Sequence, residues 1–406
     1  MRSFVVASLV SLCALAAPAA SATPASNPSL TIAPPKSDFD FAMYDSLRTK
    51  QGNLCFSPTS VRQALGIAYL GAKGPTASEM SKALHFDADR TKAAANAKDE
   101  IAGWQSARGA SQLSIANRLW EDKSFKMDSG YVSLVNGAYG SAVEPIDFSH
   151  APNPSRLTIN DWVAKQTNDK IKDLLSPDGV TSDTRVVITN AIWFKGTWEK
   201  TFDKKATQDA PFKVDAKTSV NVPTMHQTST FSFASVPGAK ILEMPYGKSD
   251  LAMDVILPDD ANGLSKIEDT LSRGNFATWT SNMTKQKVAV SFPKVTFTWG
   301  GSMKSELGKL GMKTAFTTSA DFTGIASPGA TGGSLVVSDV VHKAFVAIDE
   351  EGTEAAAATA VTMIRASVSV EPPPVRFDAD HPFVFVIRDV KTSRVLFMGR
   401  VTNPKA

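Results

Sequence analysis

Cysteine is scarce in this chain of 406 residues, which contains only Cys13 and Cys55. Cys13 lies in an apolar N-terminal run, and if that run is cleaved off, Cys55 has no partner for an intrachain disulfide. A disulfide framework therefore does not stabilise the fold. A chain of this length must rely on a large hydrophobic core instead, and we interpret Cys55, which stands between two apolar residues, as buried filler in that core.

An excess of charge of one sign is also lacking. The chain has 43 Lys and Arg against 40 Asp and Glu, a formal net charge of +3. Residues 90–98 hold three cations, but Asp87, Asp89 and Asp99 lie close to them. Nucleic acids and other polyanions bind dense basic surfaces. The sequence therefore predicts neither a nucleic-acid partner nor a polyanion activator.

Only one stretch of the chain is a continuous apolar run, residues 4–17, and it is too short to span a membrane. Arg2 precedes it and the small residues Ala20-Ser21-Ala22 follow, a pattern typical of a cleavable secretory signal. We expect a signal peptide over residues 1–22 and a disordered lead, rich in Pro, Ser and Ala, over residues 23–36. A lipid anchor at Cys13 is the competing interpretation, which Leu12 fits poorly. The expected location is secreted or extracellular, or periplasmic in a bacterium, and not in a membrane.

Motifs of hydrolases and metalloenzymes are missing. No G-x-S-x-G occurs, and the one S-x-x-K match, from Ser291 to Lys294, contains Pro293, which would break the helix that this motif needs. The histidines show no metal-binding spacing; they are His85, His150, His226, His342 and His381. We therefore expect no catalytic residue, no metal and no cofactor.

The sequence does contain a change of periodicity near residue 185. Before it, apolar residues recur at helical spacing, and residues 76–79 (TASE) have the form of a capping box. After it, the pattern is that of strands, expected at 186–194, 220–224, 241–244, 252–257, 288–292, 335–348 and 383–388. This predicts an α+β fold with large, mostly antiparallel sheets. No linker divides the chain, so we expect one domain over residues 37–406.

The most informative segment is residues 350–374, EEGTEAAAATAVTMIRASVSVEPPP. From Thr353 to Ile364 it has no proline and no glycine, so it could enter a sheet without losing a ladder bond. Alternation puts Glu354, the one charged residue between Thr353 and Ile364, on the face opposite Thr353. An Ala-rich helix over residues 355–358 is the alternative. Gly352 lies just before residues 353–364, and Pro372 to Pro374 follow after them, which is typical of an exposed loop. Residues 353–364 therefore resemble a strand that is held in an exposed loop.

These residues carry a family resemblance. Residues 350–358 (EEGTEAAAA) resemble the hinge of the reactive-centre loop of an inhibitory serpin. Further segments resemble serpin motifs in the family's order, which are residues 53–58 (NLCFSP), 189–198 (TNAIWFKGTW), 242–246 (LEMPY), 255–258 (VILP), 292–294 (FPK), 341–344 (VHKA), 380–385 (DHPFVF) and 397–400 (FMGR).

The resemblance implies the serpin fold with an exposed reactive-centre loop over about residues 350–374. It also implies a monomeric suicide-substrate inhibitor of serine proteases, with cysteine proteases as a second target class. In that mechanism the protease cleaves the loop, and the loop inserts into the central sheet while the enzyme is still covalently attached. A non-inhibitory serpin serving as a carrier, chaperone or storage protein is the alternative. Simple occlusion by a binding module would not need the hinge.

The resemblance also implies three groups of site residues. The hinge is Glu350, Gly352, Thr353, Glu354, Ala355, Ala356, Ala357 and Ala358. The shutter, a polar cluster beneath the central sheet, is Ser57, Ser60, Asn190 and His342. The breach, at the upper end of that sheet, is Trp193 and Lys294, and Lys294 is expected to pair with Glu350. Before insertion, Thr353 is expected at or near the surface.

The scissile bond is expected at Ala366-Ser367, because inhibitory serpins usually place it sixteen positions after the hinge glutamate, here Glu350. A small residue at this position favours an elastase-like or broad-specificity protease. A loop shorter by one residue would instead place the cut at Arg365-Ala366 and attract trypsin-like enzymes.

Overall fold

The computed structural model describes residues 39–124, 126–140, 143–327, 335–353 and 372–406. The expected signal peptide, the N-terminal lead and most of the reactive-centre loop lie outside these residues and stay predictions. These described residues group into one compact unit. No helix within the described part of the chain is long and apolar enough to cross a membrane.

Most of the helices lie in the first half of the chain, and α7 to α9 lie in the second half. The helices are α1 (Phe39–Leu47), α2 (Pro58–Gly71), α3 (Gly74–Leu84), α4 (Arg90–Ala107), α5 (Ser129–Tyr139), α6 (Pro152–Gln166), α7 (Leu264–Thr270), α8 (Arg273–Ser281) and α9 (Lys304–Lys309), with the 3-10 turns η1 (Lys204–Ala206) and η2 (Thr314–Phe316).

The start of α2 follows from its sequence. Ser57 caps it by accepting a hydrogen bond from the Ser60 backbone N–H at 3.1 Å, and Pro58 occupies the first turn. For α3 the expected capping box is wrong, because the helix begins at Gly74 and Thr76 lies inside it. The Glu79 carboxylate instead accepts hydrogen bonds from the distant Thr314, from its backbone N–H at 2.7 Å and its hydroxyl at 2.7 Å.

The strands form two sheets. They are β1 (Leu54–Phe56), β2 (Gln112–Asp122), β3 (Val143–Ile146), β4 (Val186–Thr197), β5 (Gln208–Lys213), β6 (Ser219–Val236), β7 (Ala239–Pro245), β8 (Leu251–Pro258), β9 (Thr284–Pro293), β10 (Val295–Ser302), β11 (Val341–Ile348), β12 (Gly352–Thr353), β13 (Val375–Asp378), β14 (Phe383–Asp389) and β15 (Val395–Val401). The strand expected over 335–348 begins only at Val341.

The larger sheet has the order β1-β15-β14-β8-β7-β6-β9-β13, with β5 paired to β6. The smaller sheet has the order β10-β11-β12-β4-β2-β3, and β11 also pairs directly with β4. Most pairs are antiparallel, but β4–β11, β2–β3 and β9–β13 are parallel. The predicted α+β class with mostly antiparallel sheets is therefore confirmed.

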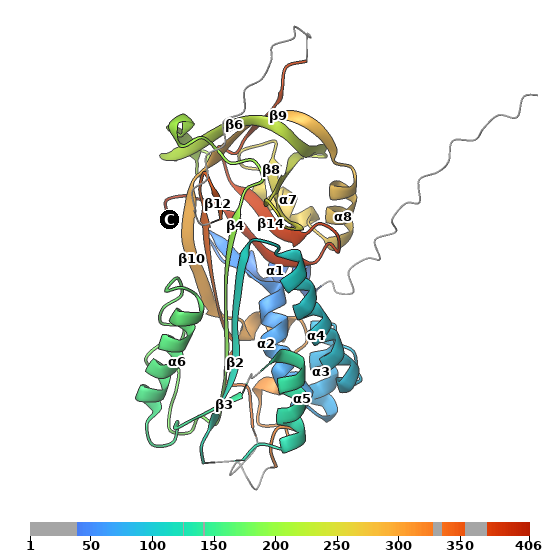
Figure 1. Cartoon of the computed structure of the whole chain (residues 1–406), viewed down its shortest axis with the longest axis vertical. Coiled ribbons are helices and arrows are strands. Elements are labelled where there is room, and N and C mark those ends of the chain that lie inside the picture. The colour runs from blue at the N-terminus through green and yellow to red at the C-terminus, as the bar shows by residue number, and fades with distance from the viewer. Residues whose placement is uncertain (1–38, 125, 141–142, 328–334, 354–371) are drawn as a thin grey trace, which may run out of the picture. The chain divides into compact units, whose positions relative to one another are not determined.

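Helices cover both faces of the smaller sheet. In Figure 1, α2, α4 and α5 lie on one side of β2 and β4, and α6 lies on the other. On the α6 side, Trp162 packs edge-on against Trp120 of β2 with ring centroids 5.4 Å apart. At the upper end, Phe194 of β4 and Val346 of β11 belong to a core cluster shared with strands of the larger sheet.

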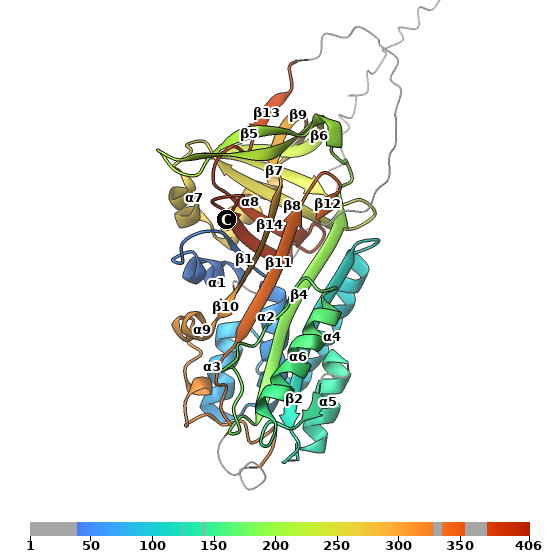
Figure 2. The same cartoon turned by 90° about the vertical axis from the view of Figure 1, so that its left-hand side faces the viewer.

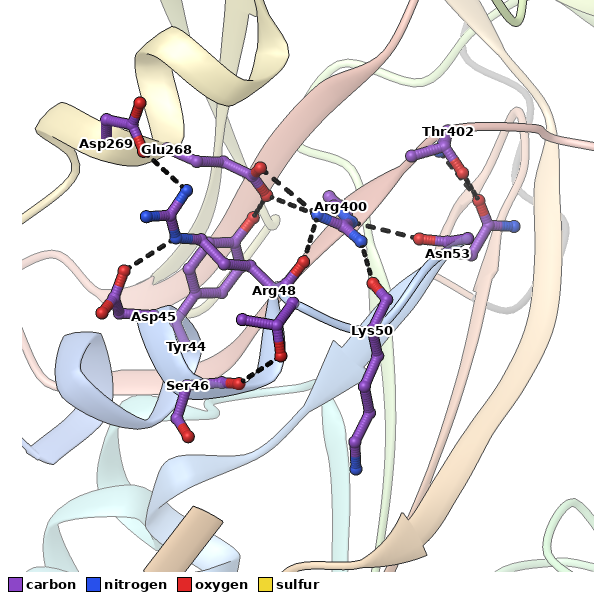
Figure 3. A network of polar contacts seen from close by, with 12 residues as sticks. Tyr44, Asp45, Ser46, Arg48, Lys50, Asn53, Glu268, Asp269, Arg400 and Thr402 are labelled. Carbon is purple, nitrogen blue, oxygen red and sulfur yellow. Dashed lines mark hydrogen bonds and ion pairs between the residues drawn. The ribbon is translucent and has the colours of Figure 1, made fainter. Parts of the chain in front are cut away.

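Buried Arg400 ties the C-terminal strand β15 to the beginning of the fold (Figure 3). Its guanidinium donates hydrogen bonds to Glu268 Oε1 of α7 at 3.0 Å and to the Arg48 carbonyl after α1 at 3.0 Å. Tyr44 of α1 donates to the same Glu268 oxygen at 2.7 Å. Arg400 and Glu268 are 6% and 5% exposed, so this ion pair is part of the interior. Through it the family motif at residues 397–400 acts as a clamp between distant elements.

Candidate functional site: the hinge between β4 and β11

The site lies where β4 and β11 separate. These parallel strands pair directly only from His342 opposite Asn190 to Ala344 opposite Ile192. Above that point β12 stands between them and pairs antiparallel with both strands. Thr353 lies opposite Ile348 of β11 and opposite Gly196 of β4. Figure 2 shows β4 and β11 as long neighbouring strands with β12 at their upper end.

A tight turn carries the chain from β11 into β12. The backbone N–H of Asp349 donates to the Gly352 carbonyl at 2.8 Å, and Asp349 Oδ1 accepts from the Glu351 N–H at 2.9 Å. Gly352 has φ +148°, and a Cβ there would lie 1.9 Å from the Gly196 carbonyl oxygen of β4. Only glycine can occupy this position, because any side chain would push β12 away from β4.

Glu350 anchors one side of this turn and is 4% exposed. Its carboxylate accepts from Lys294 Nζ at 2.9 Å and from Thr207 Oγ1 at 2.8 Å. Burial opposes ionisation of this carboxyl, but the hydrogen bonds from Lys294 and Thr207 outweigh it and lower the pKa of Glu350. The ion pair expected between Lys294 and Glu350 is thus present.

Glu351 anchors the other side. Lys204 Nζ lies 2.5 Å from Glu351 Oε1, and the Trp198 N–H donates to the Glu351 carbonyl at 2.7 Å. The Trp198 indole N–H also donates to the Asp349 carbonyl at 3.0 Å. The tryptophan that holds the turn is therefore Trp198, which the sequence analysis did not single out. Trp193 is buried further down β4, and alternation directs it to the face opposite Phe194.

Thr353 corrects an expectation drawn from the sequence. It is not at the surface but 2% exposed, with its two neighbours in the sheet already in place. Its Oγ1 shares a hydrogen bond of 2.7 Å with the hydroxyl of Tyr246. Burial raises the pKa of Tyr246 far above its ordinary value, so this hydroxyl stays protonated. The hinge residues Gly352 and Thr353 are therefore already paired in the sheet.

The four shutter residues lie together beneath the point where β4 and β11 meet. His342 Nδ1 is hydrogen-bonded to Asn190 Oδ1, and His342 Nε2 accepts from the Ser57 backbone N–H at 3.1 Å. Asn190 Nδ2 donates to Ser60 Oγ at 2.7 Å and to Asn117 Oδ1 of β2 at 2.8 Å. Asn117 is a member that sequence reasoning missed. Its register partner across β2–β4 is Asn190, which only the sheet pairing reveals.

The contacts of His342 fix its protonation state. Because Nε2 accepts a backbone hydrogen bond, the ring proton is on Nδ1 and the imidazole is neutral. Complete burial lowers the pKa of His342 to about 3. A second ring proton would sit on Nε2 and point at the Ser57 N–H. Two donors would then face each other and the hydrogen bond would be lost. The cluster is thus built around an uncharged histidine at physiological pH.

Other sequence-predicted residues fall outside the described part of the chain. These are the hinge residues Glu354 and Ala355 to Ala358 and the bonds proposed for cleavage, Ala366-Ser367 and Arg365-Ala366. Among described residues, no group of three His, Cys, Asp or Glu could hold a metal ion. Cys55 is buried, and burial raises the pKa of its thiol far above the range of a reactive cysteine.

Ser291, the candidate nucleophile of the S-x-x-K match, lies on β9 and not on a helix. Its Oγ donates to Asp378 Oδ1 at 2.7 Å and contacts His226 Nδ1 at 3.2 Å. In a hydrolytic triad the histidine stands between serine and carboxylate and accepts the serine proton. Here the serine stands in the middle, so these three residues lack the order that the chemistry needs.

Comparison with known proteins identifies the family. A family model described as Serpin (serine protease inhibitor) matches residues 35–404. The chain belongs to the serpin family. Human Serpin B3 is 38% identical over 386 residues, which cover 90% of this chain and 97% of that protein. Rat leukocyte elastase inhibitor A is 40% identical over 365 residues, covering 87% and 93%.

Solved structures agree with this assignment. Uncleaved ovalbumin matches with a TM-score of 0.81 and 31% identity, over 92% of this serpin and 100% of that chain. Serpin48 of the insect Tenebrio molitor matches with a TM-score of 0.80 and 33% identity, over 90% and 96%. Serpins are protease inhibitors and not enzymes, which agrees with the absence of hydrolase motifs from the sequence.

Proposed function

We propose that this serpin is a suicide-substrate inhibitor of serine proteases. The protease's serine oxygen attacks the carbonyl carbon of Ala366, the bond to Ser367 breaks, and the Ser367 amine leaves with a proton. An acyl-enzyme remains, joined through Ala366. The freed loop then inserts between β4 and β11 before water can hydrolyse the ester. The serpin supplies no catalytic group, because the protease's own nucleophile makes the covalent bond.

The observation that carries this proposal is the place of Thr353 between β4 and β11. Extending its register one residue at a time down β4 and β11 brings Thr359 opposite both Asn190 and His342, the pair at which the two strands now meet. The residues after Thr353 are mostly small and contain neither proline nor glycine as far as Ile364. The hinge therefore continues into a segment that can fill the gap down its whole length.

Sheet energetics also favour insertion. The pairing between β4 and β11 is parallel, whereas β12 is antiparallel to both. Insertion would exchange one parallel pair for two antiparallel ones, which are somewhat more stable per residue. The uncleaved protein would then be kinetically trapped above a more stable inserted state.

The proposed target is an elastase-like protease, or one of broad specificity. A small residue at the proposed cut, Ala366, suits a shallow primary pocket. The relatives named leukocyte elastase inhibitor from rat, mouse, frog, pig and cattle support the same class. If the cut falls at Arg365-Ala366 instead, a trypsin-like enzyme is the target.

The alternative is a non-inhibitory serpin, a class for which the likeness to ovalbumin provides a specific precedent. Incubation with pancreatic elastase and with trypsin, followed by a denaturing gel, separates the two. An inhibitor gives a stoichiometric complex that survives SDS, and mass analysis of the released peptide locates the cut. Cleavage in the loop with fully active protease and no complex would favour the alternative.

We further propose that the protein is exported as a monomer. Arg2, the apolar run 4–17 and Ala20-Ser21-Ala22 support export. Expression of the full chain in a secreting host should give a medium or periplasmic protein that starts at Thr23. Retention in the cytoplasm with residues 1–22 intact would contradict export, and light scattering checks the monomer.

A further inference from the structure

We propose that the Tyr246 hydroxyl is a latch that holds the hinge docked at Thr353, so that loop insertion starts from a short strand that is already formed. This inference rests on the proposed inhibitory function and adds to it the residue that prepares insertion. Tyr246 is a positioning residue and takes no part in the acyl transfer itself.

The ring of Tyr246 is held by contacts with residues outside the hinge. It follows β7, bridges to Trp198 across the sheets, and is 1% exposed. It stacks on Trp198 with ring centroids 4.6 Å apart at 12°, and Phe194 meets it edge-on at 5.0 Å. Both partners belong to β4 or directly follow it. Tyr246 therefore presents its hydroxyl from a rigid aromatic stack, at the level where β12 pairs with β4.

The latch acts on the strand residue and not on the turn. Lys294 and Lys204 hold Glu350 and Glu351, which precede β12. Within the described part of the chain, the Thr353 side chain hydrogen-bonds to Tyr246, and this bond joins two buried hydroxyls. Removing one partner leaves the other unpaired in the interior, which should lower the docked population by roughly tenfold.

Docking matters because insertion competes with hydrolysis of the acyl-enzyme. A docked hinge lets the loop extend an existing ladder one residue at a time. An undocked hinge must first be placed between β4 and β11. This step costs loop-closure entropy, and the new strand pairing offsets that cost only later. The latch thus shortens the time to insertion and shifts the outcome from cleaved substrate towards trapped protease.

The test is a double-mutant cycle with Tyr246→Phe, Thr353→Val and the double variant. Tyr246→Phe keeps the aromatic stack, and Thr353→Val leaves Tyr246 untouched, so one variant remains informative if the other folds poorly. The double variant removes both hydroxyls, so a loss caused by their shared hydrogen bond appears once and does not add. Tyr131→Phe is the matched control, since Tyr131 donates to the Ile67 carbonyl from a buried site on α5.

Two measurements are made on wild type and on each variant. Hydrogen exchange of the peptide covering residues 349–353 in uncleaved protein reports docking. The stoichiometry of inhibition of pancreatic elastase reports insertion. Each single variant should exchange roughly tenfold faster there and show a stoichiometry raised several-fold. The double variant should lose no more than either single variant, because all three lack the same hydrogen bond, whereas Tyr131→Phe should change neither value.

The latch is overturned if the single variants exchange and inhibit like wild type, or if the losses of the two single variants add in the double variant. Additive losses would mean that Tyr246 and Thr353 act separately, as in a merely structural role of Tyr246. Failure of the proposed function looks different: wild type itself would form no SDS-stable complex, and the exchange measurement would still decide whether Tyr246 holds the hinge.

Discussion

At the residue scale, the burial of Thr353 changes what a substitution there should do. Thr353→Arg would place a guanidinium against Tyr246 in the interior, at a cost of several kcal/mol. The chain can avoid this cost by undocking the hinge. We therefore expect the melting temperature to fall only modestly, while inhibition is lost and the loop is cleaved as a substrate.

The control for this variant is Glu354→Arg, which alternation places on the opposite face of the strand. It should keep a stoichiometry of inhibition close to that of wild type. The readout is titration of a fixed amount of elastase with each variant. Thr353→Arg that inhibits as efficiently as wild type would contradict the inward position of Thr353 and the insertion mechanism with it.

His342 predicts a pH dependence of stability. The unfolded chain protonates this histidine below about pH 6.5, whereas the folded protein resists protonation down to about pH 3. The unfolded state then binds more protons, so stability is complete above pH 6.5 and falls as the pH is lowered, by about 2 kcal/mol between pH 6.5 and 5. Asp40 and Asp254 act oppositely, because burial raises their folded pKa to about 6.

Comparison of variants isolates the histidine from these carboxyl groups. His342→Gln should be less stable than wild type at pH 7.5, and the difference between the urea midpoints of the two proteins should narrow from pH 7.5 to pH 5, because only wild type loses the contribution of His342. His150→Gln, at an exposed position, should follow the wild-type profile. Parallel profiles for wild type and His342→Gln would show that His342 is not the group that resists protonation.

At the element scale, Arg400 predicts how firmly the C-terminal strand is held. Arg400→Met removes the guanidinium and leaves the Glu268 carboxylate buried without its cation, which should cost about 3–5 kcal/mol. Arg48→Met is the matched control, because its partners Asp45 and Asp269 are exposed and such pairs contribute about 0–1 kcal/mol. Urea unfolding measures both. Equal losses would mean that the Arg400 cluster does not clamp β15.

The elements also show how far sequence reasoning reaches. The α+β class and the contact of Lys294 with Glu350 could be predicted, because they follow from periodicity and a family motif. The strands β1 to β3 before residue 185 and the helices α7 to α9 after it were not expected from the periodicity. The start of α3 could not be predicted, because Glu79 does not cap its own helix. It hydrogen-bonds instead to Thr314, which is distant in sequence. Asn117 was missed for the same reason, because its role arises from strand pairing.

The docking of β12 shows the other limit. The sequence predicted Thr353 at or near the surface before insertion and could not show that it was already in the sheet. That depends on a gap between β4 and β11 and on Tyr246, which comes from another sheet. Likewise, Trp193 and Trp198 belong to one sequence motif. Only the path of the turn at residues 349–352 shows that Trp198 is the tryptophan that hydrogen-bonds to the turn.

At the scale of the whole molecule, we expect that the uncleaved protein is not in its most stable state. The smaller sheet holds a parallel pair that is short and stops where β12 begins, and the segment that could fill the gap is attached to β12. A nick in a surface loop ordinarily leaves stability unchanged or lowers it. Here the nick should release a strand that completes the sheet.

The central claim is therefore tested most directly by the melting temperatures of intact protein and of protein nicked once in the loop by a non-target protease. Insertion predicts that the nicked form melts far above the intact form, with the N-terminus of the C-terminal fragment confirming a cut within residues 354–371. Thr353→Arg, nicked in the same way, should gain much less. A nicked wild-type protein that melts at or below the temperature of the intact protein would contradict the mechanism.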